Sequence, residues 1–90
     1  QGMLQTVIYS GFLDASAPSR KLHYVFVEAN VSDPKSAPLA VWLNGGPGCS
    51  SLIGMLTEIG PYLVGNDYKL GDMLKKNDYS WANVANILFL

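Results

Sequence analysis

The sequence feature that most restricts the fold is a continuous apolar run, Leu39–Leu43, that leads directly into the glycine-rich segment Asn44–Gly48. Unbroken apolarity over the length of a strand suits burial on both faces, as in a central strand of an α/β sheet. The Asn-Gly-Gly-Pro-Gly segment that follows marks a tight turn. The sequence therefore predicts a buried strand with a glycine-rich loop at its end.

A short helix is predicted directly after this loop. Apolar residues recur there with the spacing 0, 3, 4 and 7, which is one face of a helix, at Leu52, Met55, Leu56 and Ile59. Ser50 or Ser51 can cap the first turn. Gly60-Pro61 is a typical stop signal, because glycine accepts the left-handed conformation at a helix end and proline cannot continue the helix.

The flanking segments predict strands and turns. Residues Lys21–Asn30 alternate between two faces and predict a strand, whereas the polar segment Val31–Pro38, with two prolines, predicts a connecting loop. Tyr62–Tyr79 predicts turns at 65–67, 71–72 and 75–78, with one short strand between them. Val84–Leu90 predicts an apolar strand that ends without a turn, so we expect the chain to be truncated after Leu90. The predicted fold class is α/β, with an antiparallel β start that enters an α/β unit.

Composition narrows the functional classes. The 90 residues are 49% hydrophobic and 14% charged, as in soluble globular chains. The net charge of −1 and the scattered Lys and Arg residues offer no basic surface for nucleic acid. No apolar run approaches the ~20 residues of a membrane span. On folding, a chain this short buries only a little more than ~60% of the surface that the unfolded chain exposes. We therefore expect poor independent stability, with an exposed edge on the terminal strand.

Two residue types limit the sites that the chain can build. Cys49 is the only cysteine and His23 the only histidine, so neither an internal disulfide nor a multi-ligand zinc site is available, and we expect no metal and no cofactor. His23 fits a strand histidine at the surface or in the core. Asn30-Val31-Ser32 is an Asn-x-Ser glycosylation sequon in a polar turn, which makes Asn30 a candidate acceptor.

The glycine loop has three possible uses. A strand that delivers glycines to a helix N-terminus presents free amide groups, and two such donors about 2.7–3.1 Å from a developing oxyanion stabilise acyl transfer. Phosphate binding is disfavoured, because the pattern from Gly46 lacks the third glycine of a dinucleotide fingerprint and no lysine follows as in a Walker motif. A purely structural turn would use the same residues. Taken alone, the loop leaves oxyanion stabilisation and a structural turn equally open.

The ten residues Trp42–Ser51 resemble the signature of the serine carboxypeptidase family, whose members have the α/β-hydrolase fold. Other segments resemble landmarks of that family in the same order, closest to its cathepsin A and carboxypeptidase Y-like members. These segments are Tyr9–Leu13, Leu22–Glu28, Thr57–Tyr62, Asp78–Trp81 and Ala85–Leu90. The resemblance implies that residues 1–90 are the N-terminal segment of a single α/β-hydrolase domain, with strands leading into a strand, an oxyanion loop and a helix.

The resemblance also implies roles for single residues. The amide of Gly46 corresponds to an oxyanion-hole donor. The substrate-binding residues are Asn44, Gly45 and Glu58, which would bind the terminal carboxylate of a peptide. Glu58 would do so as a protonated acid that shares a hydrogen bond, an arrangement that works at low pH, where like groups can share a proton. Without the resemblance, Glu58 would be interpreted as a solvated helix-end residue.

Two further positions, Cys49 and Asp78, can be compared with the family pattern. Cys49 matches a family cysteine that commonly forms a disulfide with a much later cysteine, which these 90 residues do not contain. Asp78 replaces a proline that is usual in the family, which affects only the local turn.

The catalytic nucleophile has no counterpart in the sequence. α/β-Hydrolases carry it in a Gly-x-Ser-x-Gly elbow, with the acid and the histidine later in the chain. None of the serines has glycine at both −2 and +2; Ser50 comes nearest, with Gly48 before it but Leu52 after it. We therefore expect an N-terminal fragment of a serine-type carboxypeptidase, a hydrolase that releases C-terminal amino acids from peptides, and we expect the chain alone to be inactive.

Two other functions stay open from the sequence: a fragment of a carboxypeptidase-like acyltransferase, and a non-catalytic remnant or binding unit. The expected partners are the C-terminus of a peptide substrate and the remainder of a carboxypeptidase chain, with no nucleic acid and no membrane span. The resemblance implies a lysosomal, vacuolar or secreted location.

Overall fold

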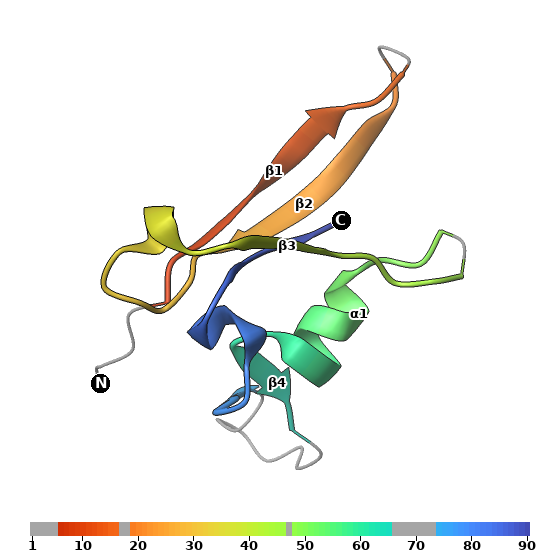
Figure 1. Ribbon diagram of the computed structural model, residues 1–90. Coiled ribbons are helices and arrows are strands. Elements are labelled where there is room, and N and C mark those ends of the chain that lie inside the picture. The colour runs from red at the N-terminus through yellow and green to blue at the C-terminus, as the bar shows by residue number, and fades with distance from the viewer. Residues whose placement is uncertain (1–5, 17–18, 47, 66–73) are drawn as a thin grey trace.

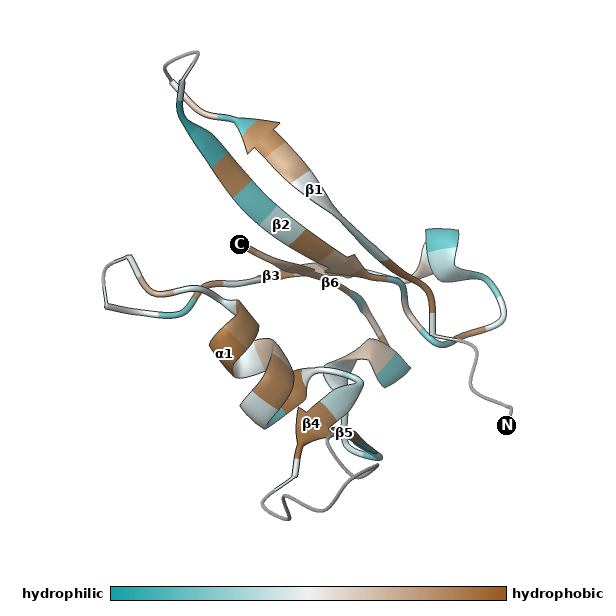
Figure 2. Ribbon diagram, turned by 180° about the vertical axis from the view of Figure 1, so that it is seen from behind, coloured by the Kyte–Doolittle hydropathy of each residue, from teal (hydrophilic) through white to brown (hydrophobic). Residues whose placement is uncertain are grey.

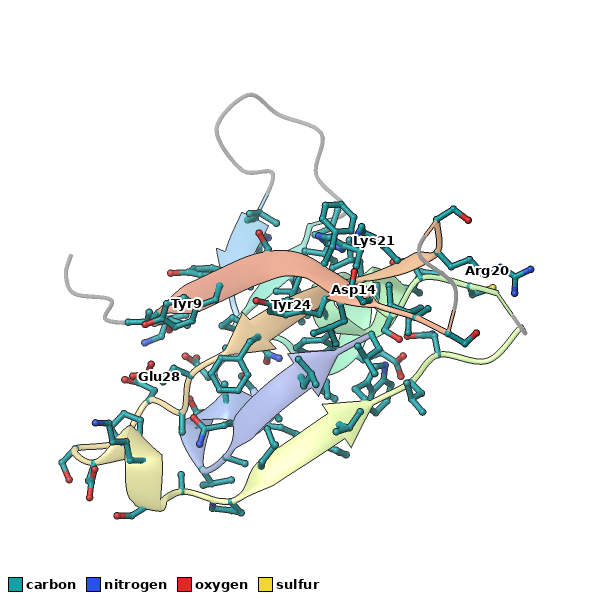
Figure 3. The ribbon with its side chains drawn as sticks, turned by 90° about the horizontal axis from the view of Figure 1, so that it is seen from above. Tyr9, Asp14, Arg20, Lys21, Tyr24 and Glu28 are labelled. Carbon is teal, nitrogen blue, oxygen red and sulfur yellow. The ribbon has the colours of Figure 1, made fainter. Side chains whose placement is uncertain are left out.

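The computed structural model describes residues 6–16, 19–46, 48–65 and 74–90. A four-stranded mixed sheet runs in the order β1 (Ile8–Asp14), β2 (Lys21–Val27), β6 (Asn86–Phe89) and β3 (Leu39–Trp42). A separate hairpin pairs β4 (Tyr62–Val64) with β5 (Leu74–Lys76). Figure 3, seen from above, shows the four strands of the larger sheet side by side in this order.

The helical segments are short. The longest begins with α1 (Leu52–Gly54) and continues as a π-helical turn, η2 (Met55–Ile59). Two 3₁₀ turns, η1 (Pro34–Ser36) and η3 (Trp81–Asn83), flank strands β3 and β6. The predicted helix over 52–59 is therefore confirmed, although five of its residues wind as a π turn. In Figure 1, α1, η2 and the β4 hairpin lie on one side of the four-stranded sheet.

Strands β1 and β2 form the antiparallel start that the sequence predicts. Their register runs from the pair Ile8 and Val27 to the pair Asp14 and Lys21. The last two side chains form an ion pair near the loop end of the hairpin, where Figure 3 shows them next to each other. The predicted strand Lys21–Asn30 is confirmed, but it ends at Val27.

Strand β6 lies inside the sheet. It pairs antiparallel with β2 and parallel with β3, from Leu39 opposite Asn86 to Trp42 opposite Phe89. The predicted strand over 84–90 is thus confirmed within narrower bounds, and the parallel pairing provides the predicted α/β unit. The prediction that this terminal strand has an exposed edge is wrong, because β2 and β3 occupy both of its edges.

The core lies between the sheet and the helical layer. It is formed by buried apolar residues of β2, β6, η2 and the segment around η3: Val25, Val27, Ile59, Ala82, Ala85, Ile87 and Phe89. From the predicted helix face, Ile59 is buried and Leu52 and Met55 pack against this cluster. Alternate residues of β2 and β6 therefore supply one covered face of the sheet.

The prediction that both faces of the run 39–43 are buried is wrong. Leu39 and Val41 are 61% and 52% exposed, whereas Ala40 and Trp42 are half-buried against the core. The reason is that β3 is an edge strand, and within the described residues the helical layer covers only one face of the sheet. Figure 2 shows that apolar segments also run through β1 and β2, beyond the reach of that layer.

The helix ends at Gly60, but not in the predicted left-handed conformation. Its φ of −72° and ψ of 172° are extended, as is usual for a residue that precedes proline, here Pro61. Glycine is nevertheless required, because a Cβ atom at this position would lie 2.0 Å from the carbonyl oxygen of Met55. A close approach to the preceding turn, and not a positive φ, explains this glycine.

Side chains from the segment after β5 satisfy the carbonyl groups at the helix end. The Asn77 side-chain amide donates to the carbonyl oxygens of Gly60, at 2.9 Å, and Glu58, at 3.2 Å. The Ser80 hydroxyl donates to the carbonyl oxygen of Ile59 at 2.9 Å. Asn77 and Ser80 are both buried, so these bonds replace the backbone cap that a left-handed glycine would have allowed.

One of the two predicted capping serines has that role. The Ser50 hydroxyl accepts a hydrogen bond from the backbone N–H of Leu52 at 3.2 Å, at the start of α1. Ser51 is the residue that precedes the helix, but its side chain makes no capping hydrogen bond. The segment 62–79 contains two short strands, where one was predicted. The prediction of a turn at 75–78 is wrong for Lys75 and Lys76, which belong to β5, and residues 66–67 and 71–72 of the other two predicted turns lie outside the described residues.

Candidate functional site

The loop between β3 and α1 depends on glycines with unusual backbone angles. Gly46 has φ of +146° and Gly48 has φ of +93°, values that residues with a side chain rarely adopt. A Cβ atom on Gly46 would also lie 2.8 Å from Sγ of Cys49. At Gly45, in contrast, no heavy atom of the described residues other than its chain neighbours lies within 4 Å of the Cβ position, so the space on that side of the backbone is open.

Asn44 lies at the start of the loop, and its side-chain oxygen already accepts two hydrogen bonds. Its Oδ1 accepts hydrogen bonds from Nε1 of Trp42, at 2.8 Å, and from the backbone N–H of Gly54, at 3.1 Å. Both partners are donors only, so they fix which end of the amide is oxygen. Among the described residues, its Nδ2 group forms no hydrogen bond.

Glu58 lies on the π-helical turn η2 and its side chain is exposed. Glu58 lies four residues, about one helical turn, after Gly54, whose backbone N–H donates to the Asn44 side chain. π-Helical turns occur frequently at functional sites. Within the part of the chain that the structure describes, no hydrogen bond joins the side chains of Glu58 and Asn44. Glu58 therefore lies on the helix to which Asn44 bonds through Gly54, without a side-chain hydrogen bond between Glu58 and Asn44 among the described residues.

A cavity of about 390 Å³ lies beside the loop. Its lining combines both ends of the loop with residues of β2 and the residue after β6: Leu22, His23, Leu43, Asn44, Gly48, Cys49, Ser50, Ser51 and Leu90. Gly46 and Glu58 are not among these residues. His23 is exposed and packs edge-on against Phe12, with ring centroids 5.3 Å apart, so of the two predicted environments, surface and core, it has the surface one.

Two predicted sites for covalent modification are exposed, Cys49 within the loop and Asn30 after β2. Cys49 is a free, exposed cysteine. Asn30 is exposed and follows β2, as a glycosylation acceptor would require. In the described ranges, no three His, Cys, Asp or Glu side chains gather in a metal-binding group. None of the helices described is long and apolar enough to cross a membrane.

Sequence reasoning missed Gly54 and Ser51 as parts of this site. Gly54 donates its N–H to Asn44, and a Cβ atom on it would lie 2.1 Å from Nε1 of Trp42. A glycine inside a predicted helix costs stability, so its presence was a usable signal of close packing. Ser51 accepts a hydrogen bond from the backbone N–H of Asn44, and no sequence pattern predicts that contact.

Comparison with known proteins matches the chain to one family. The family model described as serine carboxypeptidase matches residues 1–90. The lysosomal protective protein of Mus musculus is 52% identical over 82 residues, which cover 91% of this chain and 16% of the relative. Carboxypeptidase Y homolog A of Phaeosphaeria nodorum is 50% identical over 82 residues, 91% of this chain and 14% of the relative. Serine carboxypeptidase ctsa-3.1 of Caenorhabditis elegans is 48% identical over 83 residues, again 91% and 14%.

The chain belongs to the serine carboxypeptidase family. This family implies the α/β-hydrolase fold, and the mixed sheet with its parallel crossover from β3 to β6 is consistent with that fold. The chain spans only about one sixth of the length of the curated relatives it matches.

Proposed function

We propose that this chain is the part of a serine carboxypeptidase that recognises the terminal carboxylate of a peptide and prepares the oxyanion site. The observation that carries the proposal is the state of the Asn44 side chain. Because its oxygen already accepts two hydrogen bonds, the amide offers only N–H donors to a ligand. Donors without an acceptor suit a carboxylate and exclude a cation.

The loop supports the second half of the proposal. α/β-Hydrolases take one oxyanion donor from the loop between their third strand and first helix, and here that loop carries Gly45 and Gly46. The φ of Gly46 sets its amide in a position that glycine alone accepts. The open space around Gly45 leaves room for a ligand to approach the backbone. Glu58, exposed on η2, completes the carboxylate recognition in this proposal.

The nucleophile and its base come, in this proposal, from the remainder of a carboxypeptidase chain. A serine there attacks the carbonyl of the last peptide bond, and the Gly46 amide stabilises the oxyanion. The C-terminal amino acid leaves, and water hydrolyses the acyl-enzyme. The likeness to a lysosomal protein and to carboxypeptidase Y homologs supports a lysosomal, vacuolar or secreted location.

The proposal is tested in a chimera in which this chain replaces the matching segment of serine carboxypeptidase ctsa-3.1, its relative of 48% identity. We expect the chimera to release C-terminal amino acids from peptides with a free carboxylate far faster than from the same peptides with an amidated C-terminus. Asn44→Ala should reduce that preference mainly through KM for the free acid. Gly46→Ala should lower kcat by about 10²–10³, the usual cost of one oxyanion donor.

Three results would contradict the proposal. A folded chimera without hydrolytic activity would support a non-catalytic unit. Transfer of acyl groups from an activated ester, in place of hydrolysis, would support an acyltransferase. Equal rates on acid and amide substrates in the chimera would remove the assigned role of Asn44.

A further inference from the structure

Ser51 has a buried hydroxyl that neither caps the helix nor belongs to a nucleophile elbow. Its exposure is 2%, and its Oγ accepts a hydrogen bond from the backbone N–H of Asn44 at 3.0 Å. The adjacent Ser50 is exposed and takes the capping role through the N–H of Leu52. The two neighbouring serines therefore have different roles: Ser50 caps the helix, and Ser51 bonds to Asn44 at the other end of the loop.

The backbone of Ser51 is held by two other elements. Its N–H donates to the carbonyl oxygen of Leu90, directly after β6, at 3.2 Å. Its carbonyl oxygen accepts from the N–H of Met55 at 3.2 Å, which fixes it to the helix. Leu90 is in turn bonded to β3, because its N–H donates to the carbonyl oxygen of Trp42 at 3.4 Å. Ser51 thus stands where β3, β6 and α1 meet.

The hydrogen bond from Asn44 to Ser51 closes the glycine loop. The two residues are seven positions apart, and Gly45 and Gly46 lie between them. Glycines restrict the backbone least of all residues, so a loop that contains them needs external restraints to hold one conformation. Asn44 carries both the carboxylate-binding side chain and the backbone that leads into Gly46. A restraint on its N–H therefore acts on both proposed functions of the loop.

We propose that Ser51 is a positioning residue for the acyl-transfer site, whose hydroxyl holds Asn44 and thereby sets the Gly46 amide. Burial and the bond from Asn44 exclude a role as the nucleophile. The kinetic consequences of this inference rest on the proposed function. The closure of the loop by Ser51 does not, so the loop closure and the proposed function can be tested separately.

The test compares Ser51→Ala with Ser50→Ala in the chimera defined above, because the pair removes the same hydroxyl at adjacent positions. Hydrogen exchange measured by mass spectrometry on the segment from Trp42 to Gly46 should be about tenfold faster in Ser51→Ala, the scale of one hydrogen bond. In Ser50→Ala the same segment should exchange as in the parent. This readout decides the loop closure even if the parent chimera hydrolyses no peptide.

Kinetics decide the positioning role. Ser51→Ala should reduce kcat/KM on free-acid peptides by about tenfold and lower the preference for acid over amide substrates, whereas Ser50→Ala should change neither. Ser51→Thr, which keeps the hydroxyl, should restore the preference. If Ser51→Ala yields little folded protein, Ser51→Cys fills the space with a weak acceptor and should show the same loss. Parent-like exchange and preference in either the alanine or the cysteine variant would overturn the proposal.

Discussion

A Cβ atom placed on Gly54 would lie 2.1 Å from Nε1 of Trp42, so the first turn of the helix touches the end of β3 with no room for a side chain. Intrinsic helix propensity favours alanine over glycine by about 1 kcal/mol. We expect the opposite sign here: Gly54→Ala should lower the free energy of unfolding by roughly 1–3 kcal/mol through overpacking. Urea denaturation of the chimera measures this change.

Gly45→Ala is the matched control for that experiment. Apart from its two chain neighbours, no heavy atom of the described residues lies within 4 Å of the Gly45 Cβ position, and the φ of Gly45 is not positive. The substitution should therefore change the unfolding free energy by no more than about 0.5 kcal/mol. Equal effects of the two substitutions would show that Gly54 is not a packing contact.

Asn86 should be one of the most sensitive polar positions in the chain. It is 9% exposed; its oxygen accepts from the N–H of Ala29 at 2.8 Å, and its amide donates to the carbonyls of Pro34, at 2.9 Å, and Ala37, at 3.3 Å. Asn86→Ala leaves these buried groups unpaired and should cost about 1–3 kcal/mol of unfolding free energy.

Asn83→Ala serves as the comparison for Asn86, since the Asn83 amide donates to the carbonyl of Asp78 at an exposed site. Its cost should stay within about 0.5 kcal/mol. Similar losses for both asparagines would show that the connection from Asn86 to the loop before β3 adds nothing.

Asn30 should accept a single N-linked glycan when the chain passes through a eukaryotic secretory pathway. It is exposed just beyond β2, and Asn30-Val31-Ser32 is the sequon of this chain. A band that shifts on endoglycosidase treatment, and that disappears in both Asn30→Gln and Ser32→Ala, is the expected result. An unmodified wild-type chain that has entered the pathway would contradict this prediction.

Cys49 should react with a maleimide in the native 90-residue chain about as fast as in denaturant, because it is exposed and the chain holds no second cysteine. Cys49→Ser should take no label. In the chimera we expect the opposite, since the resemblance pairs this position with a later cysteine, and labelling should then require a reductant. A native chain that reacts only after unfolding would show that Cys49 is covered.

Local patterns predicted the elements well, because alternation in β2 and the helical spacing from Leu52 to Ile59 act within each segment. The errors arose where distant residues decide the outcome. The exposure of Leu39 and Val41 depends on which strand takes the sheet edge, and the run of apolar residues carries no such information. The helix end depends on Asn77 and Ser80, which lie about twenty residues later.

The candidate site divides in the same way. The glycine-rich segment predicted a tight turn between β3 and α1, whereas the positive φ angles of Gly46 and Gly48 are known only from the structure. The contacts of Asn44 with Trp42, Gly54 and Ser51 require the strand, loop and helix to be folded together. The family resemblance identified Asn44 as a site residue, whereas the atoms that hold Asn44 in place are identified only by the structure.

The position of β6 between β2 and β3 has a consequence for the order of folding. The β1 and β2 hairpin needs only neighbouring residues and can form early, but β2 and β3 are consecutive strands that never pair with each other. They must stay apart until residues 86–89 enter between them, some sixty positions after β2. Such non-local pairing slows folding, because the loop-closure entropy is lost before the contacts form. Direct pairing of β2 with β3 is then the error that the chain must avoid while it folds.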